Sequence, residues 1–266
     1  QEEMESNYRV LIGQYPSGMS VNCLLAAKCF DIHQEHIVIG NGAAELIKCL
    51  LEQLDGKLGV IRPTFEEYPN RWEKECVVYD CTKNDISYSA NDIISFFSEN
   101  PIDTLVLINP DNPTGHCLNQ TEINNILQWC KKKNINLILD ESFVDFAADE
   151  NISWLSERVL CENSNLYIVK SVSKSYGVPG LRLGILASGN VDIIKVLKQA
   201  VPIWNINSMA EFFMQILDKY KNDYKNSLVK LRLERNRFFE QLCQIKGVKV
   251  YPSQANYFMC ELLDKD

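Results

Sequence analysis

Histidine is scarce in this sequence, and the common signatures of metal and redox chemistry are missing. Only three histidines stand among the 266 residues, His33, His36 and His116, so a histidine-centred triad is not expected and no metal site is predicted. His33 and His36 precede a predicted strand and are expected at the surface. The ten cysteines are scattered and form no C-x-x-C pair, which favours free thiols in a reducing cytoplasm over disulfides or zinc ligands.

Long apolar runs, long basic runs and a dinucleotide fingerprint are missing too. No apolar stretch is long enough to span a membrane and no signal-peptide pattern opens the chain, so no membrane partner is expected. The net charge is -8 and the longest basic run is residues 131–133, so no nucleic-acid partner is expected. The absence of G-x-G-x-x-G argues against a nucleotide-binding α/β protein. Because Gln1 rather than Met opens the chain, an earlier natural start is expected.

Apolar strands alternate with helical patterns along most of the chain. Strands are predicted near residues 37, 59, 77, 106, 138, 168 and 185, with helices between most of them. This alternation predicts an α/β fold with a mainly parallel seven-stranded sheet flanked by helices. Residues 1–204 are expected to form a large domain with an N-terminal segment. Residues 205–266 are expected to form part of a smaller, truncated α+β domain, with a helix capped by Ser208 and running to about residue 241, and with strands at 248–251 and 256–260.

A lysine among hydroxyl residues is the main chemical signature. Residues 171–184 read S-V-S-K-S-Y-G-V-P-G-L-R-L-G. An amine such as that of Lys174 can form a Schiff base with an aldehyde. The hydroxyls of Ser171 and Ser173 and the guanidinium of Arg182 can hold a phosphate by charge-assisted hydrogen bonds. The segment therefore indicates a site for a phosphorylated carbonyl compound, although S-x-S-K alone is a weak signal.

Three further segments fall at the predicted carboxyl ends of strands. G-N-G-A-A-E at 40–45 opens a helix after a strand, which aims backbone amides at an anion unless it is a plain turn. N-P-D-N-P-T-G at 109–115 cannot continue a strand and predicts a rigid loop, at the edge where open parallel sheets bind ligands. Asp140 ends a buried strand, where a carboxylate needs a partner; the alternative is a helix N-cap.

Together these motifs resemble the class I/II aminotransferases, the fold-type-I family that uses pyridoxal phosphate. The resemblance implies that Lys174 holds the cofactor as a Schiff base and serves as the catalytic acid and base. It also implies that the cofactor phosphate is bound by the backbone of Gly42, Ala43 and Ala44 and by Ser171, Ser173 and Arg182.

The same resemblance assigns partners to the cofactor ring. Asp140 is implied to pair with the pyridine nitrogen, and Asn112 to donate to the phenolic oxygen. The R-P-T-F-E-E-Y segment at 62–68 implies that Tyr68 stacks on the ring, with a core aromatic as the alternative. The Tyr15-Pro16 pair implies a homodimer in which Tyr15 reaches the neighbouring active site; the alternative is an aromatic packed in a turn.

One departure from the family pattern bears on the reaction. Many members have tyrosine three residues after the aspartate, whereas this chain has Phe143. D-E-S-F-V-D-F at 140–146 and P-G-L-R-L-G at 179–184 resemble the threonine-phosphate decarboxylases, the branch beside the histidinol-phosphate aminotransferases. The resemblance implies an aminotransferase that acts on an amino acid or amino-phosphate substrate, with a small-molecule amino donor and a keto acceptor.

Decarboxylation of an O-phospho amino acid is the alternative, and a non-catalytic domain of a fusion or regulator is a third reading. The family arginine that binds the substrate carboxylate is expected beyond Asp266, so the chain resembles a fragment of a longer protein.

Overall fold

The computed structural model describes residues 2–263, and the chain divides into two compact units. The first unit comprises Gln1–Asp55 and Trp154–Asn222, and the second comprises Gly56–Ser153 and Asp223–Asp266. Each unit therefore draws on two separate stretches of the chain. These boundaries differ from those of the contiguous domains expected from the sequence, 1–204 and 205–266. The division into those two domains stays a prediction.

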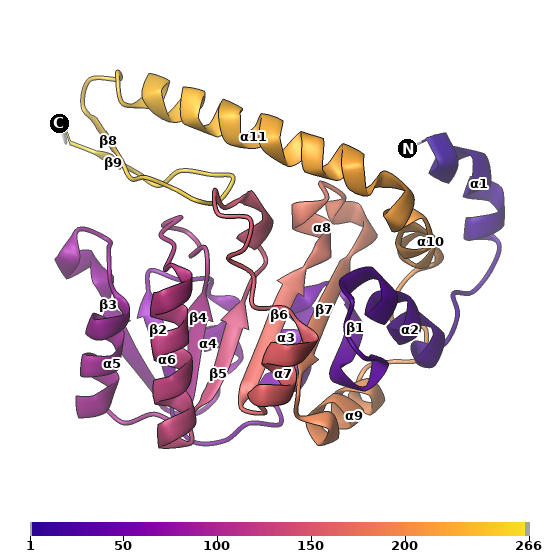
Figure 1. Cartoon of the computed structure of the whole chain (residues 1–266), viewed down its shortest axis with the longest axis horizontal. Coiled ribbons are helices and arrows are strands. Elements are labelled where there is room, and N and C mark those ends of the chain that lie inside the picture. Colours follow the sequence, from indigo (N-terminus) through magenta and orange to yellow (C-terminus); the bar gives the residue numbers. More distant parts are fainter. Residues whose placement is uncertain (1, 264–266) are drawn as a thin grey trace. The chain divides into compact units, whose positions relative to one another are not determined.

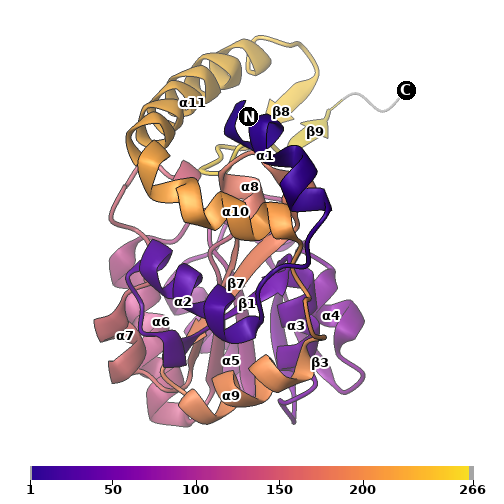
Figure 2. The ribbon, with the colours of Figure 1, turned by 90° about the vertical axis from the view of Figure 1, so that its right-hand side faces the viewer.

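Three strands form the sheet of the first unit. They are β1 (Ile37–Asn41), β6 (Leu166–Ser171) and β7 (Leu183–Ser188), and β7 pairs antiparallel with both of the others. Every residue of β6 and β7 is buried, as is typical of strands that are covered on both faces. The helices α2 (Met19–Phe30), α3 (Ala43–Leu51) and α9 (Val191–Ala200) pack against β1, and Figure 2 shows α2 and α9 beside it.

The helical elements of the first unit include several short turns. They are α1 (Glu2–Ile12), α2 (Met19–Phe30), η1 (Gln34–His36), α3 (Ala43–Leu51), α7 (Glu157–Glu162), α8 (Val172–Ser175), η4 (Pro179–Leu181), α9 (Val191–Ala200), α10 (Ser208–Ile216) and η5 (Leu217–Tyr220), where η marks a 3-10 helix.

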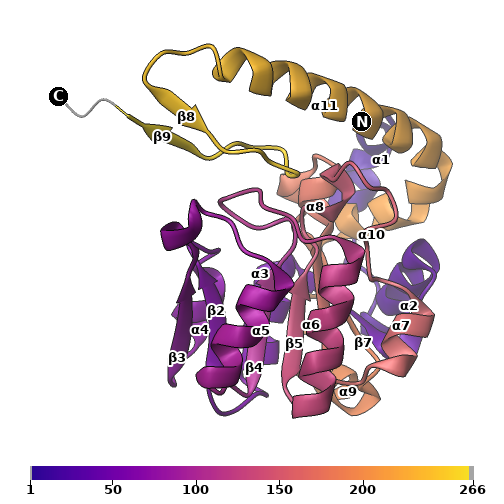
Figure 3. The same ribbon diagram turned by 60° about the vertical axis from the view of Figure 1, so that its left-hand side comes forward.

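Four parallel strands of the seven-stranded sheet belong to the second unit. They are β2 (Leu58–Arg62), β3 (Cys76–Asp80), β4 (Thr104–Ile108) and β5 (Asn136–Asp140). Helices α5 (Ala90–Glu99) and α6 (Gln120–Lys133) lie side by side along these strands (Figures 1 and 3). Both helices begin with a capping box, which satisfies the free amides of the first turn. The remaining helical elements are α4 (Glu67–Arg71), η2 (Cys81–Asn84), η3 (Val144–Phe146) and α11 (Lys221–Leu242).

The last part of the chain departs from the prediction in two places. The single helix expected from Ser208 is two α-helices, α10 and α11, separated by the 3-10 turn η5. The side chain of Asn207, not Ser208, accepts the capping hydrogen bond from the amide of Ala210. Strand β8 (Val248–Val250) confirms the first C-terminal strand, but its antiparallel partner β9 is Cys260–Leu262 rather than residues 256–260.

All seven strands expected for the main sheet are present. Their order is β1-β7-β6-β5-β4-β2-β3, and helices flank the strands of each unit. The predicted fold class, a mainly parallel seven-stranded α/β sheet followed by a small α+β part, is confirmed. No helix among residues 2–263 is long and apolar enough to cross a membrane.

Candidate functional site

A glycine turn at the end of β1 forms one part of the predicted site. Gly42 has φ +79° and stands at the N-cap of α3, where no side chain caps the helix. The first-turn amides, including those of Ala43 and Ala44, are thus left for another acceptor. A Cβ atom at Gly42 would lie 2.6 Å from Nη2 of Arg182. Only glycine lets the guanidinium lie directly against this helix N-terminus.

The charge of Arg182 is not balanced within the described part of the chain. Its side chain is exposed, and among residues 2–263 no carboxylate forms an ion pair with it. A guanidinium and a helix N-terminus that converge in this way make a site for an anion, because both carry positive charge toward the same point. The structure therefore brings together four of the predicted phosphate-binding residues.

The lysine segment lies beside this turn in the same unit. Ser171 ends β6, and Lys174 is half-buried in the short helix α8 that follows. The hydroxyl of Ser173 accepts a hydrogen bond from the Leu183 amide (2.7 Å) and donates to the Leu183 carbonyl (3.3 Å). Ser173 thus anchors α8 to the start of β7, a role that the sequence did not indicate. Its role in phosphate binding stays a prediction.

Strand β7 connects the lysine segment with the glycine turn. A Cβ atom at Gly184 would lie 2.3 Å from the backbone nitrogen of Ala43, so β7 passes directly beneath the N-terminus of α3. Arg182 precedes β7 with φ +54°, a left-handed conformation that is uncommon outside glycine, asparagine and aspartate. Lysine, arginine and helix amides are therefore all carried by one sheet of the first unit.

The second unit buries the predicted ring partner. Asp140 is only 3% exposed at the end of β5, and its Oδ2 accepts a hydrogen bond from the hydroxyl of Tyr68 (2.8 Å). Its Oδ1 accepts from the amide of Ser142 (2.9 Å). Burial, followed by the nearby charge of Asp140 and its hydrogen bond, raises the pKa of Tyr68 well above its usual value. Tyr68 consequently stays a donor, and the carboxylate is held in one orientation.

Tyr68 is both a buried aromatic residue and a hydrogen-bond partner of Asp140. The residue is fully buried on α4, in agreement with the alternative of a core aromatic, and it also reaches the predicted ring partner. Stacking on the cofactor ring stays a prediction. The alternative for Asp140, a helix N-cap, is not what the structure has, because η3 begins later, at Val144.

The N-P-D-N-P-T-G segment is a closed loop tied by its own polar groups. Asn109 donates to the carbonyl of Leu118 (3.1 Å) and accepts from its amide (2.8 Å). The hydroxyl of Thr114 donates to the buried carboxyl of Asp111 (2.5 Å). The peptide bonds 109–110 and 112–113 are cis. Asn112 is half-buried and its side chain has no hydrogen-bond partner within residues 2–263, which leaves its amide to a ligand.

Phe143 and Tyr257 form a contact that sequence patterns did not indicate. Phe143 is buried, and its ring meets the ring of Tyr257 edge-on, with centroids 5.0 Å apart. The hydroxyl of Tyr257 donates to the carbonyl of Asp111 (2.8 Å). Tyr257 therefore connects the phenylalanine that departs from the family pattern with the asparagine loop. No local signal could have found it, because residues 111 and 257 are 146 positions apart.

Tyr15 is a largely exposed residue of the first unit. Its side chain is 78% exposed, and its ring stacks on that of Trp204 with centroids 4.3 Å apart. The aromatic is thus packed against a neighbour, as the turn alternative expected, but most of its surface stays accessible. Its predicted contact with a second subunit stays a prediction.

The donor groups in each unit suit different parts of pyridoxal phosphate. The first unit offers a primary amine for the aldehyde, and a guanidinium and helix amides for the phosphate. The absence of a side chain at Gly42 lets the guanidinium of Arg182 lie against the N-terminus of α3. The second unit offers a buried, oriented carboxylate for a ring nitrogen and an amide for a ring oxygen. The residues present therefore fit this cofactor.

Comparison with known proteins agrees with that fit. A family model described as "Aminotransferase class I and II" matches residues 11–266. The L-serine phosphate decarboxylase of Sulfurospirillum multivorans is 35% identical over 263 residues, covering 96% of this chain and 67% of that protein. The CMP-5'-(3-aminopropyl)phosphonate synthase of Streptomyces rubellomurinus is 31% identical, covering 98% of this chain and 41% of that protein.

A solved structure is similar over nearly the whole chain. The histidinol-phosphate aminotransferase from Clostridium acetobutylicum superimposes with a TM-score of 0.84 and 28% identity, covering 98% of this chain and 78% of that one. The chain therefore spans between two fifths and two thirds of the length of the two relatives named above.

Proposed function

Because the chain belongs to the aminotransferase class I and II family, whose cofactor is pyridoxal 5'-phosphate, we propose that it is a decarboxylase of an O-phospho amino acid. The observation that carries this proposal is the similarity to an L-serine phosphate decarboxylase, 35% identity across 96% of the chain. Phe143 supports the proposal, because it replaces the tyrosine of many aminotransferases three residues after Asp140. The segment that contains it, D-E-S-F-V-D-F, resembles that of the threonine-phosphate decarboxylases. The substrate class is O-phosphoserine or a close homologue.

The residues of the first unit bind and fix the cofactor in this proposal. Lys174 forms the covalent link to the aldehyde carbon. The amides of Ala43 and Ala44 and the guanidinium of Arg182 hold the phosphate dianion, since the positive helix end and the fixed positive charge converge there. Ser171 adds a hydroxyl at the end of β6, and Ser173 keeps α8 in place through Leu183.

The residues of the second unit orient and polarise the ring. Asp140, held by Tyr68 and Ser142, presents a carboxylate to the pyridine nitrogen. When bound, the cofactor supplies an acceptor for the electron pair left at the substrate α-carbon. The amide of Asn112 donates to the phenolic oxygen, and Phe143 supplies no second donor there.

The chemical step breaks one bond and places one proton. The bond between the α-carbon and the carboxylate breaks, carbon dioxide leaves, and the electron pair stays at the α-carbon. The ammonium group of Lys174 would deliver a proton to that carbon. The product is the corresponding amino-alcohol phosphate. No keto acceptor takes part in this reaction.

Transamination is the second candidate, because a histidinol-phosphate aminotransferase shares the fold over 98% of the chain. It would use the same lysine but would move the proton from the α-carbon to the cofactor, and it would need a keto acid to complete the cycle. We also propose a homodimer in which the exposed ring of Tyr15 contacts the neighbouring subunit.

The proposed cofactor site is tested by covalent trapping. Purified protein is incubated with pyridoxal phosphate, reduced with borohydride, digested and mapped by mass spectrometry. We expect a visible absorption band before reduction and a label on Lys174 alone. Lys174→Ala should show neither, whereas Lys170→Arg, a change to a buried lysine of β6, should keep the label. A label spread over several lysines would contradict the site.

The reaction is tested with matched substrates. O-phospho-L-serine and O-phospho-L-threonine are compared with unphosphorylated serine, and carbon dioxide and amine products are measured without any keto acid. Release of carbon dioxide from the phosphorylated compounds alone supports the proposal. Product formation that requires 2-oxoglutarate and releases no carbon dioxide would establish the second candidate instead.

A further inference from the structure

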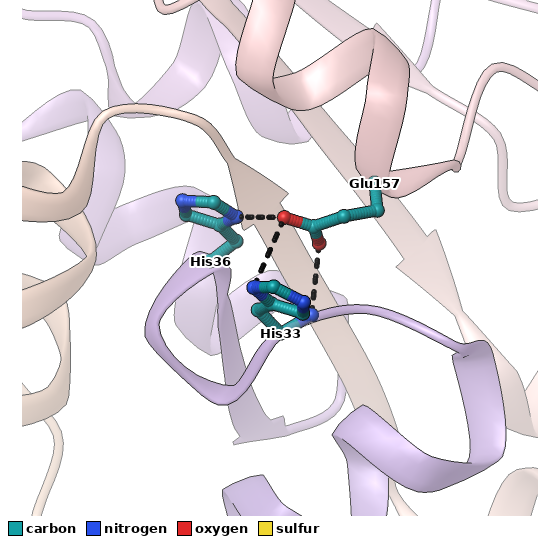
Figure 4. Close-up of side chains that lie close together, drawn as sticks. All are labelled: His33, His36 and Glu157. Atoms are coloured by element: carbon teal, nitrogen blue, oxygen red, sulfur yellow. Dashed lines mark hydrogen bonds and ion pairs between the residues drawn. The ribbon is translucent and has the colours of Figure 1, made fainter.

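Two of the three histidines meet a glutamate on the first unit, away from the residues that suit the cofactor. Oε1 of Glu157 lies 2.7 Å from Nδ1 of His36 and 3.5 Å from Nδ1 of His33. Oε2 of the same carboxylate accepts the backbone N–H of His33 (2.8 Å). Figure 4 shows both rings directed at this one carboxylate. His36 is 7% exposed, so the prediction that it lies at the surface is wrong.

Local geometry explains why the two rings lie together. His33 caps the 3-10 helix η1, and His36 is its last residue. Residues three apart in a 3-10 helix eclipse one another, and the two rings are accordingly near-parallel, at 10° with centroids 6.0 Å apart. Glu157 is the first residue of α7. The turn before β1 and the start of a distant helix thus supply the three groups.

The spacing of these atoms matches a transition-metal site. The two histidine nitrogens and a carboxylate oxygen all lie within 4.8 Å of one another. Zinc binds such ligands at about 2.0–2.2 Å in tetrahedral geometry, which sets neighbouring ligand atoms about 3.3 Å apart. The observed separations of 2.7 and 3.5 Å lie on either side of that value. Small side-chain rotations would therefore bring these atoms to the spacing of tetrahedral zinc ligands.

The surroundings favour a cation and offer a fourth ligand. The thiol of Cys161 lies 3.3 Å from Oε1 of Glu157. The charges of Glu35 and Glu162 also act on this thiol. These carboxylates add negative charge near the cluster, which a bound divalent ion would offset.

We propose that His33, His36 and Glu157 form a binding site for a divalent transition metal such as zinc, with Cys161 or water as the fourth ligand. This site revises the sequence prediction that the chain has no metal site. An ion held there would link the turn before β1 to α7, segments that are 121 residues apart at His36 and Glu157. A metal ion that binds only the folded state stabilises it, because the free energy of metal binding adds to the free energy of folding.

The site is distinct from the cofactor residues of the same unit. His36 precedes β1, and Gly42 follows it. The five residues of β1 separate them, so six steps of about 3.3 Å each place them about 20 Å apart. The metal is therefore expected to raise the unfolding temperature and to leave the absorption spectrum of the bound cofactor unchanged.

The test is zinc titration calorimetry on chelator-treated, cofactor-loaded and borohydride-reduced protein. We expect one zinc ion per chain. His33→Ala and Glu157→Gln should each weaken binding by about tenfold or more, since each removes a ligand. Glu35→Gln, a charge-matched change on the same 3-10 turn with an exposed side chain, should weaken binding much less, since it removes a nearby charge but no ligand. His36 is left intact because it is buried.

Two further measurements address the thermal effect of zinc and the identity of the fourth ligand. Zinc should raise the unfolding midpoint of the parent and of Glu35→Gln, but not that of the double variant His33→Ala/Glu157→Gln. With cobalt on cofactor-free protein, a thiolate charge-transfer band that Cys161→Ser removes would identify the thiol as fourth ligand; no such band would identify water. Equal zinc affinity in the parent and the double variant would mean that zinc binds other cysteines, and would overturn the proposal.

Discussion

At the scale of single residues, Asp140 shows how a buried charge is accommodated before any ligand binds. Its two oxygens accept hydrogen bonds from Tyr68 and from the amide of Ser142. A buried carboxylate without such donors would be costly. The sequence pointed to Asp140 itself, since it ends an apolar strand. It could not point to the bond with Tyr68, because the two residues are 72 positions apart and only the packing of α4 brings them together.

Removing the hydroxyl of Tyr68 should destabilise the cofactor-free protein. In Tyr68→Phe, the carboxyl group of Asp140 stays buried but loses one donor, so we expect the free energy of unfolding to fall by about 1–3 kcal/mol. Tyr88→Phe is the matched control, because Tyr88 is also buried and its hydroxyl bonds to no residue within 2–263. Urea unfolding followed by circular dichroism measures both. Equal losses in the two variants would show that the bond to Asp140 does not matter.

Asp111 should make stability depend on pH. Burial raises the pKa of its carboxyl to about 7 from the ordinary 3.8, although hydrogen bonds from Thr114 and Asn112 oppose the rise. The folded state therefore holds a proton that the unfolded state releases. The contribution of this group is present in full below about pH 4, declines as pH rises toward 7, and is constant above that.

The variant Asp111→Asn should remove this dependence. It keeps an acceptor for the hydroxyl of Thr114 but has no proton to lose. Between pH 4.5 and pH 7 we expect the stability of the parent, relative to the variant, to fall by up to about 1.4 kcal/mol per pH unit. Urea unfolding of cofactor-free protein across this range measures the difference. The prediction is wrong if the two proteins follow parallel curves.

At the scale of elements, the periodicity of apolar residues predicted the strands of the main sheet, whose positions depend on local sequence. All seven strands of the main sheet were found where apolar runs end at turns. The misplaced strand at 256–260 has a different cause. Tyr257 bonds to the carbonyl of Asp111 and packs on Phe143, and these long-range contacts override the local preference for a strand. Likewise η5 divides α10 from α11, and no proline or glycine marks that division.

The contact between β7 and α3 should tolerate no side chain at Gly184. An added Cβ would meet the backbone nitrogen of Ala43 at 2.3 Å, and backbone cannot rotate away as a flexible side chain can. Gly184→Ala is therefore expected to lower stability by about 1–3 kcal/mol and to weaken cofactor binding, because it displaces the amides that are proposed to hold the phosphate.

Gly180→Ala is the control for this prediction. An added Cβ there would meet no atom within 4 Å, and Gly180 is not among the glycines with positive φ. We expect unchanged or slightly raised stability, since alanine restricts the unfolded chain more than glycine does. Thermal unfolding and titration with pyridoxal phosphate measure both variants. Similar behaviour of the two would mean that the close approach of β7 to α3 relaxes without cost.

At the scale of the whole molecule, the sequence offers candidates for the cofactor site more readily than it indicates the assembly. The cofactor motifs fall in short segments whose spacing is visible along the chain, so their residues could be named before their positions were known. The cluster at Glu157 was missed, because His33 and His36 lie more than 120 positions from their partner and three scattered histidines give no pattern. The subunit contact proposed for Tyr15 likewise depends on a surface rather than on a motif.

The exposed apolar side chains near Tyr15 give the proposed dimer a test. Ile203 is 76% exposed beside Trp204, which stacks on Tyr15. If this surface meets a second copy, a charge at position 203 would be buried without a partner. Ile203→Asp is therefore expected to weaken dimerisation by at least about tenfold, which corresponds to about 1.4 kcal/mol, and to leave the fold intact.

Sedimentation equilibrium over a range of protein concentrations measures this effect. The parent chain of 30.5 kDa is expected to sediment at twice that mass, and Ile203→Asp to shift toward the monomer. Leu233→Asp is the control, because Leu233 is an equally apolar and 66% exposed residue on α11, in the other unit. A monomeric parent, or an equal shift in both variants, would contradict the dimer through Tyr15. A shift confined to Ile203→Asp would place the subunit contact on the surface that carries Tyr15 and Trp204.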